Sequence, residues 1–167
     1  MPKPIIFLDI DGVLLPLNEN ECSRVIYFND GSVGDNWLPG LIPDLNRLWE
    51  AFQPYWASWW HEDSHIVGDL YEIPPTGYCH FGESYPDIKH LPMEDWKIPS
   101  LDAVANDRPF VWVDDEISER GFEWATARNY SIPTKFFRTN PSEGLTKALI
   151  DEIWEWGCKH ADAMLAS

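Results

Sequence analysis

The chain has 167 residues, of which 44% are hydrophobic and 24% charged, and its formal net charge is −16. This length and composition exclude intrinsic disorder and suit a single domain over residues 1–167. No apolar run approaches the ~20 residues of a membrane helix, and the acidic excess disfavours generic nucleic-acid binding. The first apolar stretch is too short for a secretory signal and the three cysteines are widely spaced, so we expect a cytoplasmic protein with reduced thiols.

The first half of the chain alternates between strand and helix patterns. Residues 5–8 are a short, continuously apolar run, which is typical of a buried strand. Residues 17–36 hold an Asp-Gly turn next to β-forming residues, and this predicts a small hairpin flap. Apolar side chains at helical spacing predict a helix at 41–52, and a proline separates it from a second strand at 55–58. A further helix is predicted at 62–73.

The second half continues this alternation. A short helix is predicted at 100–105, a third strand at 109–113 and another helix at 118–129. Residues 135–138 are typical of a last strand, and Thr146 is a candidate N-cap for the final helix. We therefore expect an α/β fold with a Rossmann-like parallel sheet and helices on both faces.

Polar residues of particular types follow the predicted strands, at the edge where open α/β sheets place their chemistry. The candidate site residues are Asp9, Asp11, Ser58, Lys97, Asp114 and Asp115. An acid pair after a strand is by itself more often a turn or helix cap, but the ordered combination favours a site. Its residue types and order, over residues 5–115, resemble the signature motifs of the haloacid dehalogenase (HAD) superfamily. The surroundings are similar to a small branch of that superfamily without a cap domain.

The resemblance implies an HAD-like fold and a phosphatase that forms an aspartyl-phosphate. Asp9 would attack phosphorus, and Asp11 would protonate the leaving oxygen and then activate water. Ser58 would hydrogen-bond the phosphoryl group, and Lys97 would neutralise its charge. In this superfamily a dehalogenase lacks the second acid and the cation pumps carry threonine there, so the residue at position 11 points to a phosphatase or phosphotransferase.

Several carboxylates in one site would repel a phosphate unless a cation is also present, and Mg²⁺ accepts carboxylate and phosphate oxygens together. By the resemblance, its ligands would be Asp9, the backbone carbonyl of Asp11, and Asp114, with Asp115 binding directly or through water. We therefore expect Mg²⁺ as the cofactor and a phosphorylated molecule as the substrate.

Two alternatives stay open. His61 and His65, with Glu62 after the first, match the H-E-x-x-H spacing of zinc hydrolases. A third zinc ligand would come from Asp69, Glu72, His80 or His90, none of which is at a diagnostic spacing. The other alternative is a binding module that keeps the scaffold without turnover, which the intact set of candidate site residues disfavours.

The stretches between the motifs are too short for a full cap domain, so the site would be open to its substrate. Trp59 and Trp60 follow Ser58, and the predicted flap contains Tyr27 and Phe28. An indole next to the phosphate would stack on a ring attached to it. The sequence therefore suggests a nucleotide or a nucleic-acid end phosphate as substrate, although the net charge disfavours long polymers.

Overall fold

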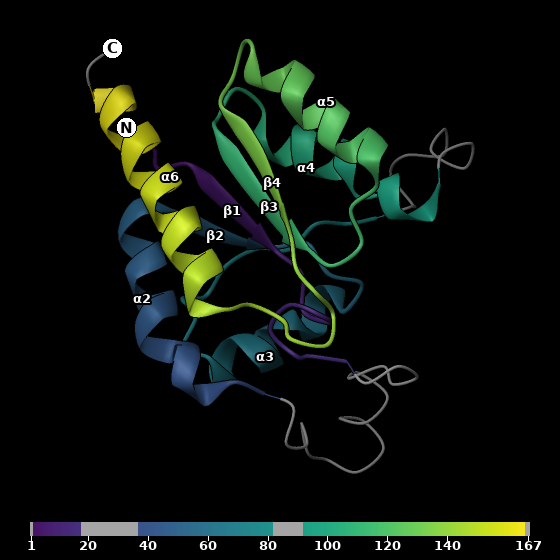
Figure 1. Cartoon of the computed structure of the whole chain (residues 1–167), viewed down its shortest axis with the longest axis vertical. Helices are drawn as coiled ribbons and strands as arrows, with labels where there is room; N and C mark the ends of the chain where they lie inside the picture. The colour runs from purple at the N-terminus through teal and green to yellow at the C-terminus, as the bar shows by residue number, and fades with distance from the viewer. Residues whose placement is uncertain (1, 18–36, 82–91, 166–167) are drawn as a thin grey trace.

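The computed structural model describes residues 2–17, 37–81 and 92–165. The predicted flap therefore lies, apart from Leu17, outside the described residues, as do its aromatic side chains. Within the described ranges, strands and helices alternate around one parallel sheet (Figure 1).

The sheet has four strands, all parallel, in the order β2-β1-β3-β4. They are β1 (Ile5–Leu8), β2 (Gln53–Trp56), β3 (Phe110–Asp114) and β4 (Thr134–Arg138). The chain passes from β1 to β2 on one side and then crosses to β3 on the other side of β1. The direction of the strand order therefore reverses between β1 and β3, and the predicted parallel α/β architecture is confirmed.

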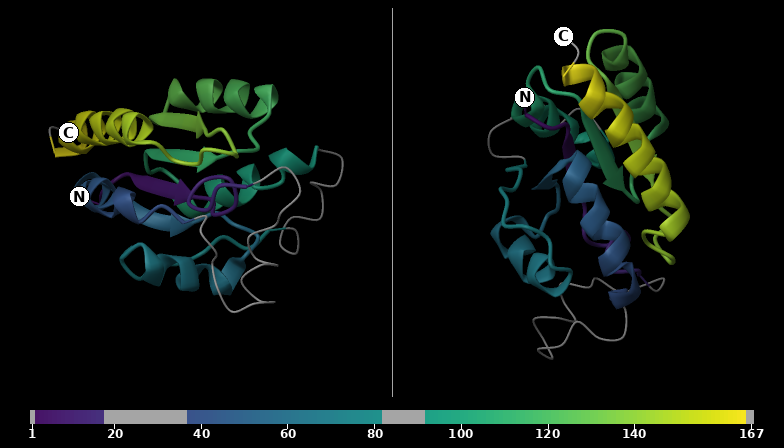
Figure 2. Two further views of the ribbon diagram at one scale, coloured as in Figure 1. Left: turned by 60° about the horizontal axis from the view of Figure 1, so that its bottom comes forward. Right: turned by 90° about the vertical axis from the view of Figure 1, so that its left-hand side faces the viewer.

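Helices cover both faces of the sheet. α2 and α6 lie side by side against one face, and α4 and α5 lie against the other (Figures 1 and 2). The α-helices are α2 (Ile42–Ala51), α3 (Ser64–Leu70), α4 (Ile98–Ala105), α5 (Glu119–Asn129) and α6 (Lys147–Leu165). Short 3₁₀ helices are η2 (Pro39–Leu41), η3 (His61–Asp63) and η5 (Met93–Asp95). In the described part of the chain, no helix is long and apolar enough to cross a membrane.

The core consists of two apolar clusters, one on each face of the sheet. Ile6 and Leu8 of β1 pack in the cluster that α2 and α6 cover, whereas Ile5 and Phe7 pack in the cluster that α4 and α5 cover. The side chains of β3 alternate between the two clusters in the same way. A strand buried on both faces has no room for polar side chains along its length, so its chemistry appears only where it ends.

Strand β2 begins and ends earlier than the predicted strand at 55–58. The N–H of Gln53 donates to the carbonyl of Pro4 at 2.9 Å, so pairing with the segment of β1 starts before the proline at position 54. Pro54 has no N–H to donate, but the next nitrogen along a strand points away from the neighbour just paired. The proline therefore fits without a lost ladder bond, which the sequence pattern did not anticipate.

Helix α3 ends at Leu70, before the end of the helix predicted at 62–73. Glu72 has a left-handed backbone with φ of +55°, and the N–H of Ile73 donates to the carbonyl of Gly68 at 2.9 Å. This bond spans five residues, which is the Schellman pattern that ends helices. The left-handed residue, and not the prolines that follow, terminates α3.

Side chains cap the starts of two predicted helices, and the cap predicted at Thr146 is confirmed. Ser118 Oγ accepts the N–H of Gly121 at 3.0 Å, and Thr146 Oγ1 accepts the N–H of Leu149 at 3.2 Å. These bonds satisfy N–H groups that have no partner inside α5 and α6.

Candidate active site

The carboxyl ends of β1 and β3 bring together acidic residues from distant parts of the chain. Asp9 directly follows β1, and its backbone N–H donates to the carbonyl of Val113 at 3.0 Å. Asp114 is the last residue of β3, the neighbour of β1 in the sheet. Open parallel sheets bind ligands at this edge, where the strand order reverses.

The turn after Asp9 packs closely against Asp115, which directly follows β3. Gly12 has φ of +75°, and a Cβ at this position would lie 2.5 Å from Asp115 Oδ2. A side chain would therefore meet both backbone strain and a steric clash, which glycine avoids. The glycine of the motif is what allows the Asp11 turn to approach Asp115.

Lys97 is a buried counter-charge for these carboxylates. Its Nζ lies 2.6 Å from Asp114 Oδ2 and 3.3 Å from Asp9 Oδ1, and it donates to the carbonyl of Ala57 at 2.8 Å. Burial opposes the charged amine, but the carboxylates of Asp114 and Asp9 outweigh it and raise the pKa of Lys97. Lys97 therefore stays charged and links the ends of β1, β2 and β3.

Three carboxylates form a group that can hold a metal ion. Asp9, Asp114 and Asp115 each offer an oxygen, and these oxygens lie within 4.8 Å of one another. Burial, followed by the charge of Asp114, raises the pKa of Asp9 well above its usual value. The same two causes raise the pKa of Asp115 to about 7. Lys97 alone does not offset this repulsion, and a set of oxygen donors suits a hard divalent cation.

These raised values predict how pH changes the effect of magnesium on stability. Between about pH 4 and pH 7 the metal-free folded state holds more protons than the unfolded chain, so its stability falls as pH rises. A magnesium ion held by Asp9, Asp114 and Asp115 would bind their deprotonated carboxylates and would remove this penalty. We expect saturating MgCl₂ to raise Tm clearly at about pH 8 and hardly at about pH 5. Thermal unfolding measures both shifts, and Asp115→Asn should reduce the shift at the higher pH. An equal shift of Tm at the two pH values would contradict a magnesium site at these three carboxylates.

Asp11 is held by a residue to which the sequence analysis gave no such role. The indole Nε1 of Trp60 donates to Asp11 Oδ2 at 3.0 Å. Trp60 is buried, whereas Asp11 is partly exposed and lines the cavity described below. The indole therefore fixes the direction of the Asp11 side chain at the wall of the cavity. No spacing rule connects these two residues in the sequence, so no sequence signal identified the contact.

Ser58 lies beside the site but does not line its cavity. It follows the end of β2 and is buried, and its Oγ accepts the N–H of Trp60 at 3.2 Å. The carbonyl of the preceding residue, Ala57, is the acceptor for Lys97. A hydroxyl that accepts one bond can still donate its proton, so the chemistry expected of Ser58 is compatible with this contact.

Thr139 is a second residue of the site that the sequence analysis missed. Its Oγ1 donates to the carbonyl of Gly12 at 2.7 Å, and its N–H donates to the carbonyl of Asp114 at 3.0 Å. It follows β4 directly, so it braces the turn after β1 and the end of β3 from the last strand. The rule that singled out Ser58, a hydroxyl at a strand end, would also have identified Thr139.

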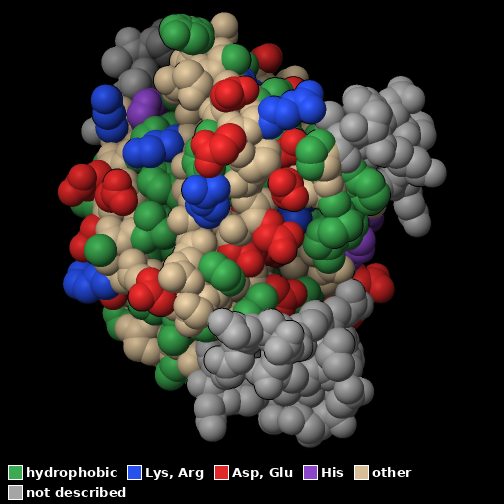
Figure 3. All heavy atoms as spheres, turned by 45° about the vertical axis from the view of Figure 1, so that its right-hand side comes forward, with side chains coloured by type: hydrophobic (Ala, Val, Ile, Leu, Met, Phe, Trp, Pro, Cys, Tyr) green, Lys and Arg blue, Asp and Glu red, His purple; other side chains and the backbone are tan. Residues whose placement is uncertain are grey.

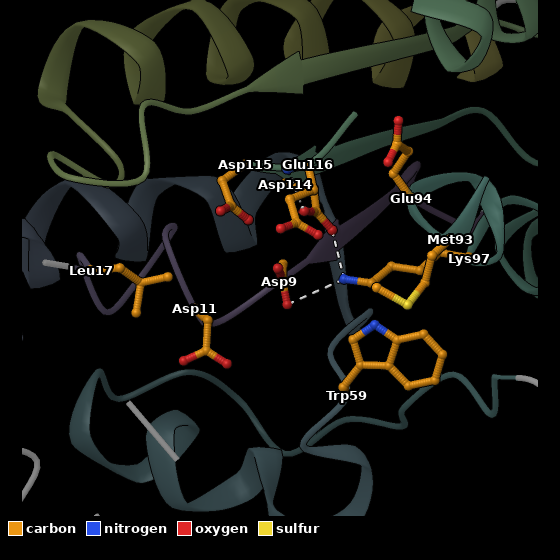
Figure 4. Close-up of a pocket in the computed structure, with 10 residues that line it drawn as sticks. All are labelled: Asp9, Asp11, Leu17, Trp59, Met93, Glu94, Lys97, Asp114, Asp115 and Glu116. Carbon is orange, nitrogen blue, oxygen red and sulfur yellow. Dashed lines mark hydrogen bonds and ion pairs between the residues drawn. The ribbon is translucent and has the colours of Figure 1, made fainter. Parts of the chain in front are cut away.

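A cavity of about 190 Å³ opens between these elements (Figure 4). It is lined by Asp9, Asp11, Leu17, Trp59, Met93, Glu94, Lys97, Asp114, Asp115 and Glu116. In the view of Figure 4, Asp9 lies between Asp11 and Lys97, and Asp114 and Asp115 lie above it. Five of the sequence-predicted residues therefore share one cavity, and Ser58 is the exception.

The geometry does not favour the zinc alternative. His61 belongs to η3 and has φ of +49°, whereas His65 belongs to α3, so no regular α-helical turn carries both imidazoles. The Nδ1 of His65 lies 2.6 Å from the carbonyl oxygen of Glu62. Among the described residues, the three aspartates at the ends of β1 and β3 are the only group of three or more metal-ligating side chains close enough to hold an ion.

Comparisons with known proteins assign no family to this chain. The chain matches no protein-family model, no curated protein and no solved structure. The geometry of the strand ends and the chemistry of their side chains therefore carry the functional conclusion.

Proposed function

We propose that this protein is a Mg²⁺-dependent phosphatase of the HAD type, which hydrolyses phosphate monoesters through an aspartyl-phosphate. The observation that carries the proposal is the contact of buried Asp9 with Lys97, beside Asp114 and Asp115 at one sheet edge. A carboxylate nucleophile, a fixed cation and an acid pair that can hold a divalent ion are the groups that this phosphoryl transfer requires.

Asp9 is the proposed nucleophile. A carboxylate oxygen of Asp9 would form a bond to phosphorus while the ester P–O bond breaks, and water would later release phosphate from the aspartyl-phosphate. Lys97 would hold the Asp9 carboxylate in place and neutralise charge on the transferred group, because its Nζ is within 3.3 Å of Asp9 Oδ1. Ser58 would donate its hydroxyl proton to a phosphoryl oxygen.

Asp9, Asp114 and Asp115 would hold the Mg²⁺, together with the backbone carbonyl of Asp11. The bound ion would supply positive charge that compensates both the carboxylates and the phosphoryl oxygens. The grouping of the three carboxylates supports this assignment, since they repel one another without a cation.

Asp11 is the proposed acid and base. It lines the same cavity as Asp9, on the side away from Lys97 in Figure 4. A proton on its carboxyl group would pass to the leaving oxygen, and the resulting carboxylate would then take a proton from the attacking water. The Trp60 indole would keep this carboxyl group aimed at the reacting atoms.

A panel of phosphate monoesters, assayed with and without MgCl₂, tests the proposal. We expect phosphate release that depends on magnesium. We also expect the site to bind beryllium fluoride, which mimics the phosphoryl group on Asp9. Folded protein that binds magnesium and phosphate but turns over no monoester would support the binding-module alternative instead.

Replacing Trp60 by Phe should lower kcat about tenfold, because one hydrogen bond to Asp11 is worth about 1.5 kcal/mol. The loss should be greater for an alkyl phosphate than for an aryl phosphate, since only the poorer leaving group needs protonation. Asp11→Asn should act in the same direction and more strongly. Trp112→Phe is the matched control, because Trp112 is equally buried in β3 and lies outside the cavity. Equal losses on both substrates would argue against this role.

The metal assignment predicts opposite results for two sets of variants. Asp114→Ala should remove magnesium-dependent activity, since it takes away both a proposed ligand and the partner of Lys97. The double variant His61→Ala/His65→Ala should keep its magnesium dependence. Activity after treatment with a zinc-selective chelator and the metal content of the purified protein measure this. Stoichiometric zinc that the double variant loses would favour the zinc hydrolase.

A further inference from the structure

Exposed apolar side chains gather at the cavity. Among the described residues, the large hydrophobic side chains with high exposure are Trp59 (41%), Met93 (64%) and Tyr130 (89%). Trp59 and Met93 both line the cavity that holds Asp9 and Lys97, and Leu17 lines it as well. Large apolar groups at the mouth of an otherwise acidic cavity indicate a ligand with an apolar part.

The position of Trp59 is set by rings around it. Its indole meets the buried ring of Phe81 edge-on, with centroids 4.9 Å apart, and lies 5.8 Å from the imidazole of His61. The ring of Phe81 also lies 5.6 Å from Lys97 Nζ. A single buried ring therefore contacts both the phosphate-neutralising lysine and the exposed indole. This arrangement holds the indole in the same cavity as Lys97.

The charge of the cavity restricts what else the ligand carries. Of the described residues that line it, Lys97 is the only one with a positive charge, whereas Glu94 and Glu116 add exposed carboxylates to the aspartates. Acidic side chains are also numerous on the face shown in Figure 3, in keeping with the net charge of −16. Lys97 and one divalent ion would serve the reacting phosphate, so a second anionic group would be repelled by the carboxylates of Glu94 and Glu116.

We infer that the substrate is a phosphate monoester whose organic part carries a planar aromatic group and no second anionic group. Trp59 and Met93 would contact this group, and Glu94 and Glu116 would exclude doubly phosphorylated compounds. This inference rests on the proposed phosphatase function. Of the two substrate classes that the sequence suggests, this inference favours a nucleotide over a nucleic-acid end phosphate, because the end of a nucleic acid carries further phosphate groups.

The test compares three compounds that share one leaving alcohol, the 5′-hydroxyl of ribose: adenosine 5′-monophosphate, ribose 5-phosphate and adenosine 3′,5′-bisphosphate. We expect kcat/KM for the monophosphate to exceed that for ribose 5-phosphate at least about tenfold, as stacking on an aromatic side chain provides. Release of the 5′-phosphate from the bisphosphate should be at least about fivefold slower than from the monophosphate, and Glu94→Gln/Glu116→Gln should narrow this gap.

Variants test whether stacking on Trp59 causes the preference for the monophosphate. Trp59→Leu should reduce the preference for the monophosphate over ribose 5-phosphate to below about threefold, and Met93→Ala, at a more exposed position, should reduce it in the same direction. Tyr130→Leu, an exposed aromatic residue outside the cavity, should leave the preference unchanged.

The outcomes distinguish this inference from the proposed function. If no compound, including an aryl phosphate, releases phosphate with magnesium, the phosphatase proposal fails. If the native protein is active but prefers the monophosphate less than about threefold, or if Trp59→Leu keeps the preference, stacking on Trp59 is overturned. Equal rates on the bisphosphate and the monophosphate would overturn the exclusion of a second anionic group.

Discussion

Replacing Asp9 by Asn is expected to lower kcat about 10,000-fold on every phosphate monoester, because an amide of nearly the same shape cannot attack phosphorus. The fold should survive. Burial and the neighbouring Asp114 raise the pKa of Asp9, so the metal-free protein already favours an uncharged group at this position. We therefore expect the Tm of the metal-free variant to equal or exceed that of the native protein.

Three measurements check the nucleophile. Initial rates with saturating MgCl₂ give the loss in kcat, and thermal unfolding shows that the Asp9→Asn protein is folded. Beryllium fluoride should bind the native protein and should not bind the Asp9→Asn variant, since the acyl-phosphate mimic needs the Asp9 carboxylate. A folded variant that keeps most of its activity would refute the aspartyl-phosphate mechanism.

Replacing Lys97 by Met should be costly for both stability and catalysis. Methionine fills the space of the aliphatic stem but leaves the buried carboxylates of Asp9 and Asp114 without their cation. Removing one partner of a buried ion pair lowers the free energy of unfolding by about 3 kcal/mol. The loss of positive charge beside the transferred phosphate should lower kcat/KM by about 100- to 1,000-fold.

The pH dependence of the Lys97→Met effect has a definite sign. Without the lysine, the unpaired carboxylates take up protons more readily, so the loss of stability should be large near neutral pH and smaller in acid. Urea unfolding at about pH 5 and about pH 7.5 measures the difference. Lys147→Met is the matched control, because Lys147 is exposed and its ion pairs with Asp44 and Asp151 are on the surface. An equal loss of unfolding free energy in the two variants would show that the buried ion pairs of Lys97 stabilise the fold no more than the surface ion pairs of Lys147.

Short apolar runs made the order of the strands along the chain predictable. Residues 5–8 and the strand ending at Asp114 are continuously apolar because helices cover both faces of the sheet, and acids follow where the burial ends. Helix starts were equally visible, since the Ser118 and Thr146 side chains cap their own helices through bonds only three residues long. These features depend on local sequence, which is why they could be predicted.

Element ends were less predictable where the backbone conformation of one residue decides them. The left-handed φ of Glu72 ends α3, although glutamate gives no signal for that conformation. The pairing of Gln53 beside Pro4 moved β2 toward the start of the chain, because the partner strand and not the proline sets where pairing begins. Such choices rest on contacts outside the local window.

By itself, the sequence determined the identity and order of the acids, the lysine and the serine, because each stands next to a recognisable strand or helix pattern. The tertiary structure alone decided which of them meet: Lys97 contacts both Asp9 and Asp114, whereas the Ser58 hydroxyl turns to the backbone of Trp60. It also decided that an indole would hold Asp11. The contacts of Lys97 and of the Trp60 indole join residues that are far apart in the chain, and only the parallel pairing of β1 with its neighbours brings the strand ends within hydrogen-bonding distance.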